Sequence, residues 1–183
     1  MTTVPYISDD DIDRQKVPAD LVATIRARRG GKLLNLDRML LHSAPIARGW
    51  NVYMGSIRKD LKISPMLREL AICAIAQLND APYEWFQHAP EFLSVGGTQA
   101  KLDALNDIEN AHLNMSVFNT AEIATLLLTR EMSRNIKVSQ ATLDKIRAAL
   151  PPDQVVEIVA VISSYNMVSR FLVALGITAD GEA

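Results

Sequence analysis

Glu69, Glu84 and His88 are the residues of this sequence whose types and spacing are best suited to acid–base chemistry. Glu84 and His88 are four positions apart, so on a helix they share one face. Burial raises the pKa of a carboxyl group and a neighbouring imidazolium lowers it, so two carboxyl groups beside an imidazole can divide into an acid and a base. The three residues therefore predict a site of proton transfer.

Two other interpretations fit the same residues. Glu84 and His88 could be an ordinary exposed pair that contributes about 0.2–0.5 kcal/mol, with Glu69 paired to Arg68 instead. By ligand type the three residues could also bind a metal ion, but a helix that supplies a single histidine is weak support for such a site, and we expect none. The residues alone leave the surface pair open beside proton transfer.

Two adjoining helices are expected to position these side chains. A serine followed by a proline begins the helix predicted over 64–79, which is apolar on nearly all sides, as core helices are. After the tight turn "NDA", a proline begins a second helix over 82–95, which ends at a pair of glycines. We expect Pro90 to kink this second helix or to end its first half early.

The two helices form an antiparallel hairpin in which residues at equal distance from the turn face each other, because both helices rise about 1.5 Å per residue. Glu69 then faces the region that begins at His88, and Cys73 faces Gln87. Tyr83 and Cys73 are expected at the edge of the site. The hairpin geometry thus brings together residues that are separated in sequence.

Apolar residues at helical spacing predict further helices, and the fold class is therefore all-α. The run "VVEIVAVI" could form a buried strand by itself, but no partner strand is expected elsewhere in the chain. The segment 106–119 is expected to be a loop. The other predicted helices cover residues 18–29, 33–43, 43–57, 98–105, 120–135, 139–150 and 153–175.

The expected organisation is one domain with two short ends. Residues 17–177 form a single helical domain, preceded by an extended arm over 1–16 and followed by a tail over 178–183. Pro5 and the acidic run that follows it argue against an early helix. Such an arm either packs on a neighbouring subunit or remains a loose tail.

Composition excludes several classes of protein. The formal net charge of −2 gives no reason to bind nucleic acid, and the one basic cluster, "RARRGGK", is typical of a solvated helix end before a glycine turn. Cys73 is the single cysteine, which excludes an internal disulfide framework and a cysteine-based zinc site. The sequence begins unlike a signal peptide, and we expect no apolar run near the roughly 20 residues of a membrane span. A cytoplasmic protein is expected.

The segment "LRELAICAIAQLNDAPYEWFQHAPEFLSVGG" resembles the core of the carboxymuconolactone decarboxylase family, which is related to the AhpD-like alkylhydroperoxidases. The segments "RARRGGKLLNLDRMLLHSAPIARGWNVYMGSIR" and "YNMVSRFLVALGI" also resemble members that lack the redox cysteines. The resemblance implies an AhpD-like helical bundle built around the hairpin. It also implies a homo-oligomer, either a trimer or a hexamer built from trimers.

The AhpD-like motif is a glutamate, eleven residues, and then Cys-x-x-Cys-x-x-x-His. Counted from Glu69, the two cysteine positions are Ala81 and Glu84, and the histidine is His88. Tyr83 replaces a second histidine of the motif. Because both sulfurs are absent, the peroxide reduction of that family is not available by its usual route. Cys73 lies in an apolar run and is expected to be buried and inert.

The decarboxylase branch of the family also carries a glutamate four residues before a histidine, which Glu84 and His88 match. The resemblance implies cofactor-independent loss of a carboxylate from a small lactone or ring metabolite, followed by protonation of the dienolate. In that scheme His88 is the acid or base, Glu84 orients it, and Glu69 is a second proton carrier. Either Arg68 or Arg48 would anchor the substrate carboxylate.

Trp85 completes the expected pocket edge beside Cys73 and Tyr83. The partners expected are thus a small acidic or lactone substrate and further copies of the chain, with no nucleic acid and no membrane. Two alternatives to a decarboxylase stay open at this point. One is a non-catalytic oligomeric binding or scaffold protein of the same fold. The other is residual hydroperoxide reduction, of peroxiredoxin type, through Cys73 with an external thiol.

Overall fold

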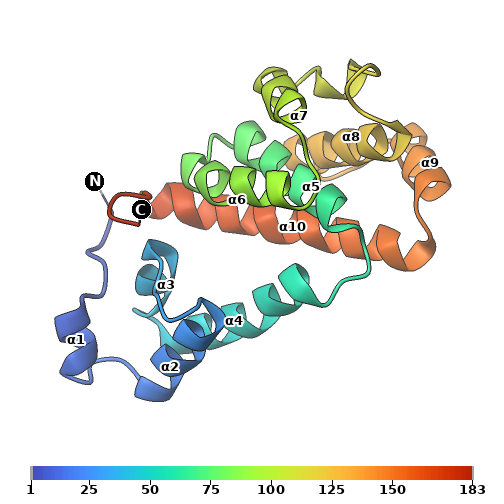
Figure 1. Cartoon of the computed structure of the whole chain (residues 1–183). Helices are drawn as coiled ribbons and strands as arrows, with labels where there is room; N and C mark the ends of the chain where they lie inside the picture. Colours follow the sequence, from blue (N-terminus) through green and yellow to red (C-terminus); the bar gives the residue numbers. More distant parts are fainter. Residues whose placement is uncertain (1, 183) are drawn as a thin grey trace. The chain divides into compact units, whose positions relative to one another are not determined.

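The computed structural model describes residues 2–182, which form ten α-helices and two short 3₁₀ helices (Figure 1). No β-strand occurs among these residues, and the prediction of an all-α protein is confirmed. The chain divides into two compact units, one comprising residues up to 60 together with those from 174 onward, the other residues 61–173. The predicted division into arm, single domain and tail stays a prediction.

The first unit contains four helices: α1 (Asp9–Asp13), α2 (Ala19–Arg28), α3 (Asn35–Leu40) and α4 (Ala44–Lys59). The apolar faces of α2, α3 and α4 form the core of the unit, in which Leu21, Ile25 and Met54 are almost completely buried. The residues recur at the three- and four-residue spacing that places them on one helical face. The sequence pattern therefore located these helices, apart from α1.

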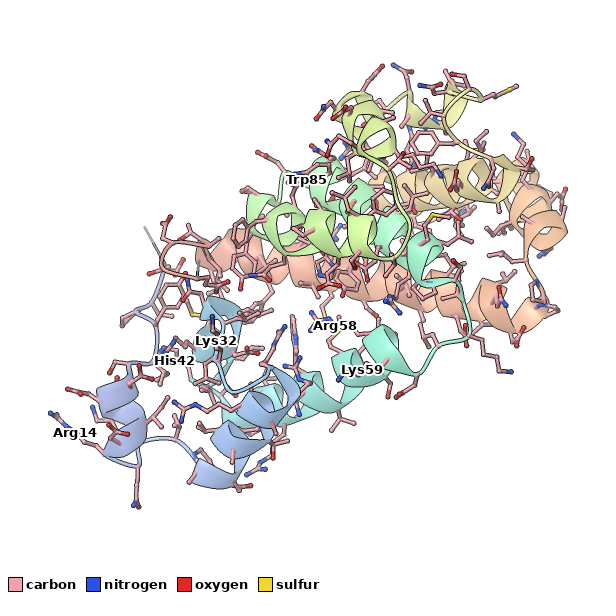
Figure 2. The ribbon with its side chains drawn as sticks, viewed as in Figure 1. Arg14, Lys32, His42, Arg58, Lys59 and Trp85 are labelled. Carbon is pink, nitrogen blue, oxygen red and sulfur yellow. The ribbon has the colours of Figure 1, made fainter. Side chains whose placement is uncertain are left out.

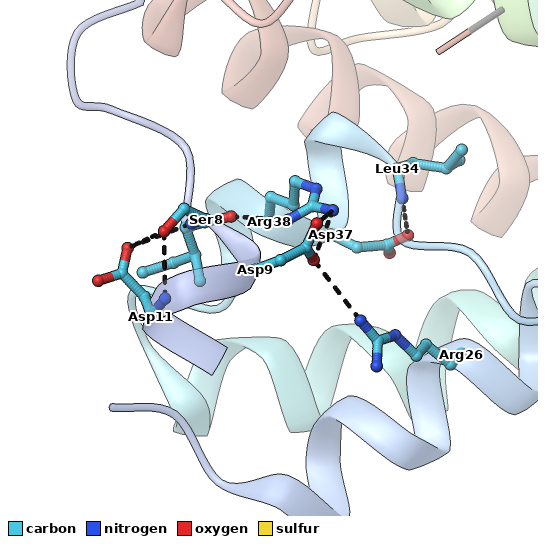
Figure 3. Close-up of polar contacts among 8 residues, drawn as sticks. Ser8, Asp9, Asp11, Arg26, Leu34, Asp37 and Arg38 are labelled. Atoms are coloured by element: carbon cyan, nitrogen blue, oxygen red, sulfur yellow. Dashed lines mark hydrogen bonds and ion pairs between the residues drawn. The ribbon is translucent and has the colours of Figure 1, made fainter. Parts of the chain in front are cut away.

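Helix α1 corrects the expectation that residues 1–16 are extended. Ser8 closes a capping box at its start, because the Asp11 N–H donates to the Ser8 hydroxyl at 3.1 Å and the Ser8 N–H donates to the Asp11 carboxylate at 3.2 Å (Figure 3). Acidic residues in the first turn also favour a helix start through its dipole. These local bonds outweigh the influence of Pro5, which lies outside the helix.

The residues before α1 are bonded to the end of the same chain. The Thr3 N–H donates to the Leu175 carbonyl at 3.0 Å, and the Thr178 N–H donates to the Tyr6 hydroxyl at 3.1 Å. The alternative of a loose tail is therefore wrong for this segment. Packing on a neighbouring subunit stays a prediction.

The second unit is arranged around α5. It contains α5 (Pro65–Leu78), α6 (Pro82–Ser94), α7 (Gln99–Ala104), η1 (Leu105–Asp107), η2 (Ala111–Leu113), α8 (Thr120–Arg134), α9 (Gln140–Ala149) and most of α10 (Pro152–Leu175). Every residue of α5 from Leu70 to Ile75 is fully buried. Figure 1 shows α5 and α6 side by side, as the hairpin prediction requires. The predicted loop over 106–119 contains the two 3₁₀ turns.

The turn of the hairpin is tight, and α6 continues past its proline. Asp80 adopts a left-handed φ of 48°, and the Ala81 N–H donates to the Ala76 carbonyl at 2.9 Å. Helix α6 runs through Pro90 to Ser94, so the prediction of an early end is wrong. Pro90 is exposed, and water can therefore bond the carbonyl group that lacks its helical partner.

Helix α10 contradicts the expectation that no apolar run approaches the length of a membrane span. It has 24 residues, its mean hydropathy reaches 1.7, and by length and composition it could cross a membrane. Core helices of soluble proteins pass the same test, and half of its most apolar window is buried within the chain. The run "VVEIVAVI" lies within this helix, as the absence of a partner strand predicted.

Candidate functional site

Helices α5 and α6 bring Glu69 and His88 into direct contact. The Nδ1 atom of His88 lies 2.7 Å from Oε2 of Glu69, although the residues are nineteen positions apart in sequence. Both side chains are largely buried, with exposed fractions of 12% for His88 and 5% for Glu69. The hairpin geometry therefore pairs these residues as the sequence predicted, and their roles stay predictions.

Arg68 holds the other oxygen of the same carboxylate. Its Nε–H donates to Oε1 of Glu69 at 3.0 Å, and only 13% of the arginine side chain is exposed. Both oxygens of Glu69 are thus engaged, one by a guanidinium and one by an imidazole. A carboxylate held at both oxygens has a fixed orientation, and so has the imidazole bonded to it.

The environment of Glu69 keeps it ionised. Burial by itself would raise the pKa of this carboxyl group, but the hydrogen bond from His88 and the charges of His88 and Arg68 outweigh it and hold the pKa below its ordinary value. Because an ionised carboxylate only accepts hydrogen bonds, Nδ1 of His88 carries the proton between them. In the neutral imidazole Nε2 is then the nitrogen without a proton.

Tyr165 of α10 is a member of the site that sequence reasoning missed. Its ring meets the His88 imidazole edge to face, with centroids 5.0 Å apart and planes at 90°. Tyr165 is fully buried, so its ring restricts the rotation of the imidazole. The available signal was the polar run of Ser164 and Asn166 around it, which interrupts an apolar helix.

Glu84 and Cys73 lie inside the protein close to this pair. Glu84 is 1% exposed, which excludes the interpretation of an exposed surface pair with His88. Burial raises the pKa of the Cys73 thiol far above its ordinary value, and the negative charges of Glu69 and Glu84 raise it further. The thiol is fully buried, so Cys73 has neither the access nor the thiolate character of a peroxidatic cysteine.

The three remaining predicted residues have different surroundings. Tyr83 is buried in the first turn of α6. Trp85 packs on the apolar cluster that contains Cys73 and Phe92, and Figure 2 shows it on α6. Arg48 belongs to the first unit, where its guanidinium lies 2.8 Å from the carboxylate of Asp20 and about half of its side chain is exposed. Of the two arginines considered as substrate anchors, Arg68 is the one that contacts Glu69.

Within residues 2–182, no three histidine, cysteine, aspartate or glutamate side chains are grouped so that they could hold a metal ion.

The chain was compared with known proteins at the level of sequence and structure. No protein-family model and no curated protein matches its sequence. Among solved structures, an uncharacterized peroxidase-related protein from Silicibacter sp. TM1040 is similar, with a TM-score of 0.73 and 14% identity over 98% of this chain and 89% of that one. A cysteine-to-alanine variant of the debrominase Bmp8, in complex with 2,3,4-tribromopyrrole, also gives a TM-score of 0.73, with 13% identity over 99% of this chain and 95% of that one.

At such low sequence identities the comparisons establish the fold of the chain, but they say nothing about its activity. The chain has an all-α AhpD-like fold, as its sequence predicted. A fold of this kind supports several chemistries, so the function must be argued from the site itself.

Proposed function

We propose that the chain is a cofactor-independent enzyme that transfers protons on a small carboxylated substrate, with His88 as the catalytic acid and base. The observation that carries this proposal is the 2.7 Å bond between Nδ1 of His88 and the largely buried carboxylate of Glu69. The bond orients the imidazole and favours its protonated form, and in this proposal the ring exchanges the proton of Nε2 with the substrate. Glu69 is then a positioning residue.

Arg68 is the candidate anchor for the substrate. Its bond to Glu69 uses Nε, and its guanidinium makes no other hydrogen bond or ion pair with residues 2–182. The Nη amino groups can therefore bind a substrate carboxylate beside the imidazole. A carboxylate bound there would lie next to the proton donor that the reaction needs.

The reaction that fits best is decarboxylation of a small carboxylated lactone or ring, as the sequence resemblance suggests. The bond between the ring carbon and the carboxylate breaks, and carbon dioxide leaves. The electron pair of the broken bond stays on the ring and forms a dienolate. Protonated His88 gives its Nε2 proton to the ring carbon and recovers a proton from water. Glu84 is buried close by and is the second carboxyl group through which protons can pass.

Thiol chemistry of the kind suggested by a peroxidase-related neighbour receives less support. The only cysteine is Cys73, which is fully buried with a raised pKa, and the positions of the redox pair hold Ala81 and Glu84. A debrominase-type reaction through a thiolate meets the same obstacle. Proton transfer needs only groups that are present in the site.

The test is turnover of a panel of carboxylated lactones, measured by release of carbon dioxide. His88→Gln is expected to lower kcat at least a hundredfold, in the range lost with a general acid. His112→Gln changes another histidine of the chain and should leave kcat unaltered. If wild type turns over a member of the panel and His88→Gln does so equally fast, the proposed mechanism is wrong.

A further inference from the structure

The first unit carries a pocket of about 380 Å³ with charged walls. Its lining comes from α1, the end of α2, the turn between α2 and α3, α3, and the C-terminal tail. The size suits a small organic ligand, since ligand pockets begin at about 300 Å³. The charged lining side chains are Asp9, Arg26, Lys32, Arg38 and Glu182.

One carboxylate of the pocket is already neutralised. Asp9 accepts hydrogen bonds from Nη2 of Arg38 at 2.9 and 3.2 Å, and Nη2 of Arg26 lies 3.6 Å from it (Figure 3). Asp9 therefore fixes the two guanidinium groups in the wall and balances part of their charge.

Lys32 adds a positive charge that is not paired with a carboxylate of the unit. It lies in the turn between α2 and α3 and is exposed (Figure 2). Within residues 2–182 its ammonium makes no hydrogen bond or ion pair. With three cations against two carboxylates, the pocket has a net positive charge that attracts an anion.

The tail places a carboxylate of the chain itself in this pocket. The Asn35 N–H donates to the carboxylate of Glu182. The Asn35 side-chain amide donates to the carbonyls of Thr178 and Asp180, at 2.9 and 3.0 Å, and so holds the tail in place. A backbone donor of the pocket wall is thus occupied by a carboxylate from a segment that reaches the pocket from the end of α10.

We propose that the pocket is a binding site for a small organic dicarboxylate, and that the Glu182 carboxylate competes with this ligand for the Asn35 N–H. One ligand carboxylate takes the Asn35 N–H in place of Glu182, and the other pairs with the Lys32 ammonium. A carboxylate ligand is favoured because the anions that the pocket already accommodates, those of Asp9 and Glu182, are carboxylates. The site is separate from the proposed proton-transfer chemistry and does not depend on it.

The experiment is calorimetric titration of the full chain with malonate at low ionic strength, where such electrostatic attraction is least screened. Glu182→Gln removes the competing charge and is expected to tighten malonate binding about tenfold. Asp180→Asn makes the same change of net charge in the tail without altering a side chain of the pocket wall, and should leave the affinity near that of wild type. Equal tightening by both variants would show a general charge effect and overturn the proposal.

A second pair of variants tests the cation. Lys32→Met is expected to weaken malonate binding about tenfold, whereas Lys59→Met, at an exposed lysine at the end of α4, should not (Figure 2). Inorganic phosphate is expected to bind more weakly than malonate. The proposal is wrong if neither wild type nor Glu182→Gln takes up malonate, if the two lysine variants behave alike, or if phosphate binds as tightly as malonate.

Discussion

Replacing Glu69 with glutamine tests the centre of the candidate site, because it changes one atom of the side chain and leaves its size unaltered. Glu69 accepts two charge-assisted hydrogen bonds, from His88 at 2.7 Å and from Arg68 at 3.0 Å. Glutamine has one acceptor oxygen and one amino group, so it cannot accept both bonds. If its oxygen faces Arg68, its amino group faces Nδ1 of His88, and the imidazole proton must move to Nε2.

The magnitude follows from the bonds that are lost. A hydrogen bond to a charged group contributes about 1.5–3 kcal/mol. The variant keeps the bond from the Arg68 guanidinium, now to an uncharged oxygen, and loses the bond that the carboxylate accepts from His88. We therefore expect Glu69→Gln to lower the free energy of unfolding by about 2–3 kcal/mol at pH 7. For a chain of this length that corresponds to a fall in Tm of about 5–10 °C. Glu91→Gln, at an exposed position of α6, is the matched control and should change neither quantity.

The difference between wild type and Glu69→Gln should also depend on pH. The pKa of Glu69 is lower in the folded chain than its ordinary value of 4.5, so its contribution to stability is present above pH 4.5. That contribution is lost as the pH falls through the lowered folded value, where both states bind the proton. The two proteins should therefore become more alike in stability as the solution is acidified below pH 4.5.

Two measurements check this reasoning: urea unfolding over a pH series, and nitrogen NMR of labelled histidine. Wild type should show His88 with its proton on Nδ1, and Glu69→Gln should show it on Nε2. Equal unfolding midpoints at pH 7 together with an unchanged tautomer would refute the account, because the 2.7 Å contact would then contribute no measurable energy and would not orient the imidazole.

Two further predictions concern the packing around the site. Cys73 is fully buried with a raised pKa, so at pH 8 its reaction with dithionitrobenzoate should be at least a hundredfold slower in the native protein than in urea; equal rates would restore the thiol-dependent alternative. Gly97→Ala would place its Cβ 2.3 Å from the buried Phe92 ring and should lower the free energy of unfolding by about 1–3 kcal/mol. Gly49→Ala is the control, because Gly49 lies in α4 and has no neighbouring side chain within 4 Å of the added carbon. It should not lower the free energy of unfolding. Similar losses of stability in the two variants would contradict the predicted clash with Phe92.

The pairing of Glu69 with His88 could be predicted from the sequence because it depends on two regular features. An antiparallel hairpin with a short turn sets which residues face each other, and the helical repeat sets which face each side chain occupies. Both features are local, and a proline marks the first residue of α5 and of α6. The burial of Glu84 did not follow from these features, and it contradicts the surface interpretation that the sequence had left open.

The contribution of Tyr165 could not be predicted in this way. It lies on α10, far along the chain, and no local rule tells which turn of a 24-residue helix meets the hairpin. The carboxylates that Arg68 and Arg48 contact, Glu69 and Asp20, likewise depended on tertiary structure, since either arginine matches a carboxylate by chemistry. Helix α1 differs from the prediction for another reason: the acidic run after Pro5, which was expected to disfavour a helix, supplies the capping box of Ser8 and Asp11.

The position of Glu84 suggests how one hairpin can serve two chemistries. Glu84 lies in the first turn of α6, where the helix dipole favours negative charge. The same field would favour a thiolate at that position in a chain with the Cys-x-x-Cys pair. Replacing sulfur with a carboxylate therefore keeps an anion in the place where the helix stabilises one. His88 lies one turn further on and is held by Glu69. On this reasoning a hairpin of this kind without the cysteine pair still carries the histidine and the two carboxyl groups that the proposed proton transfer requires.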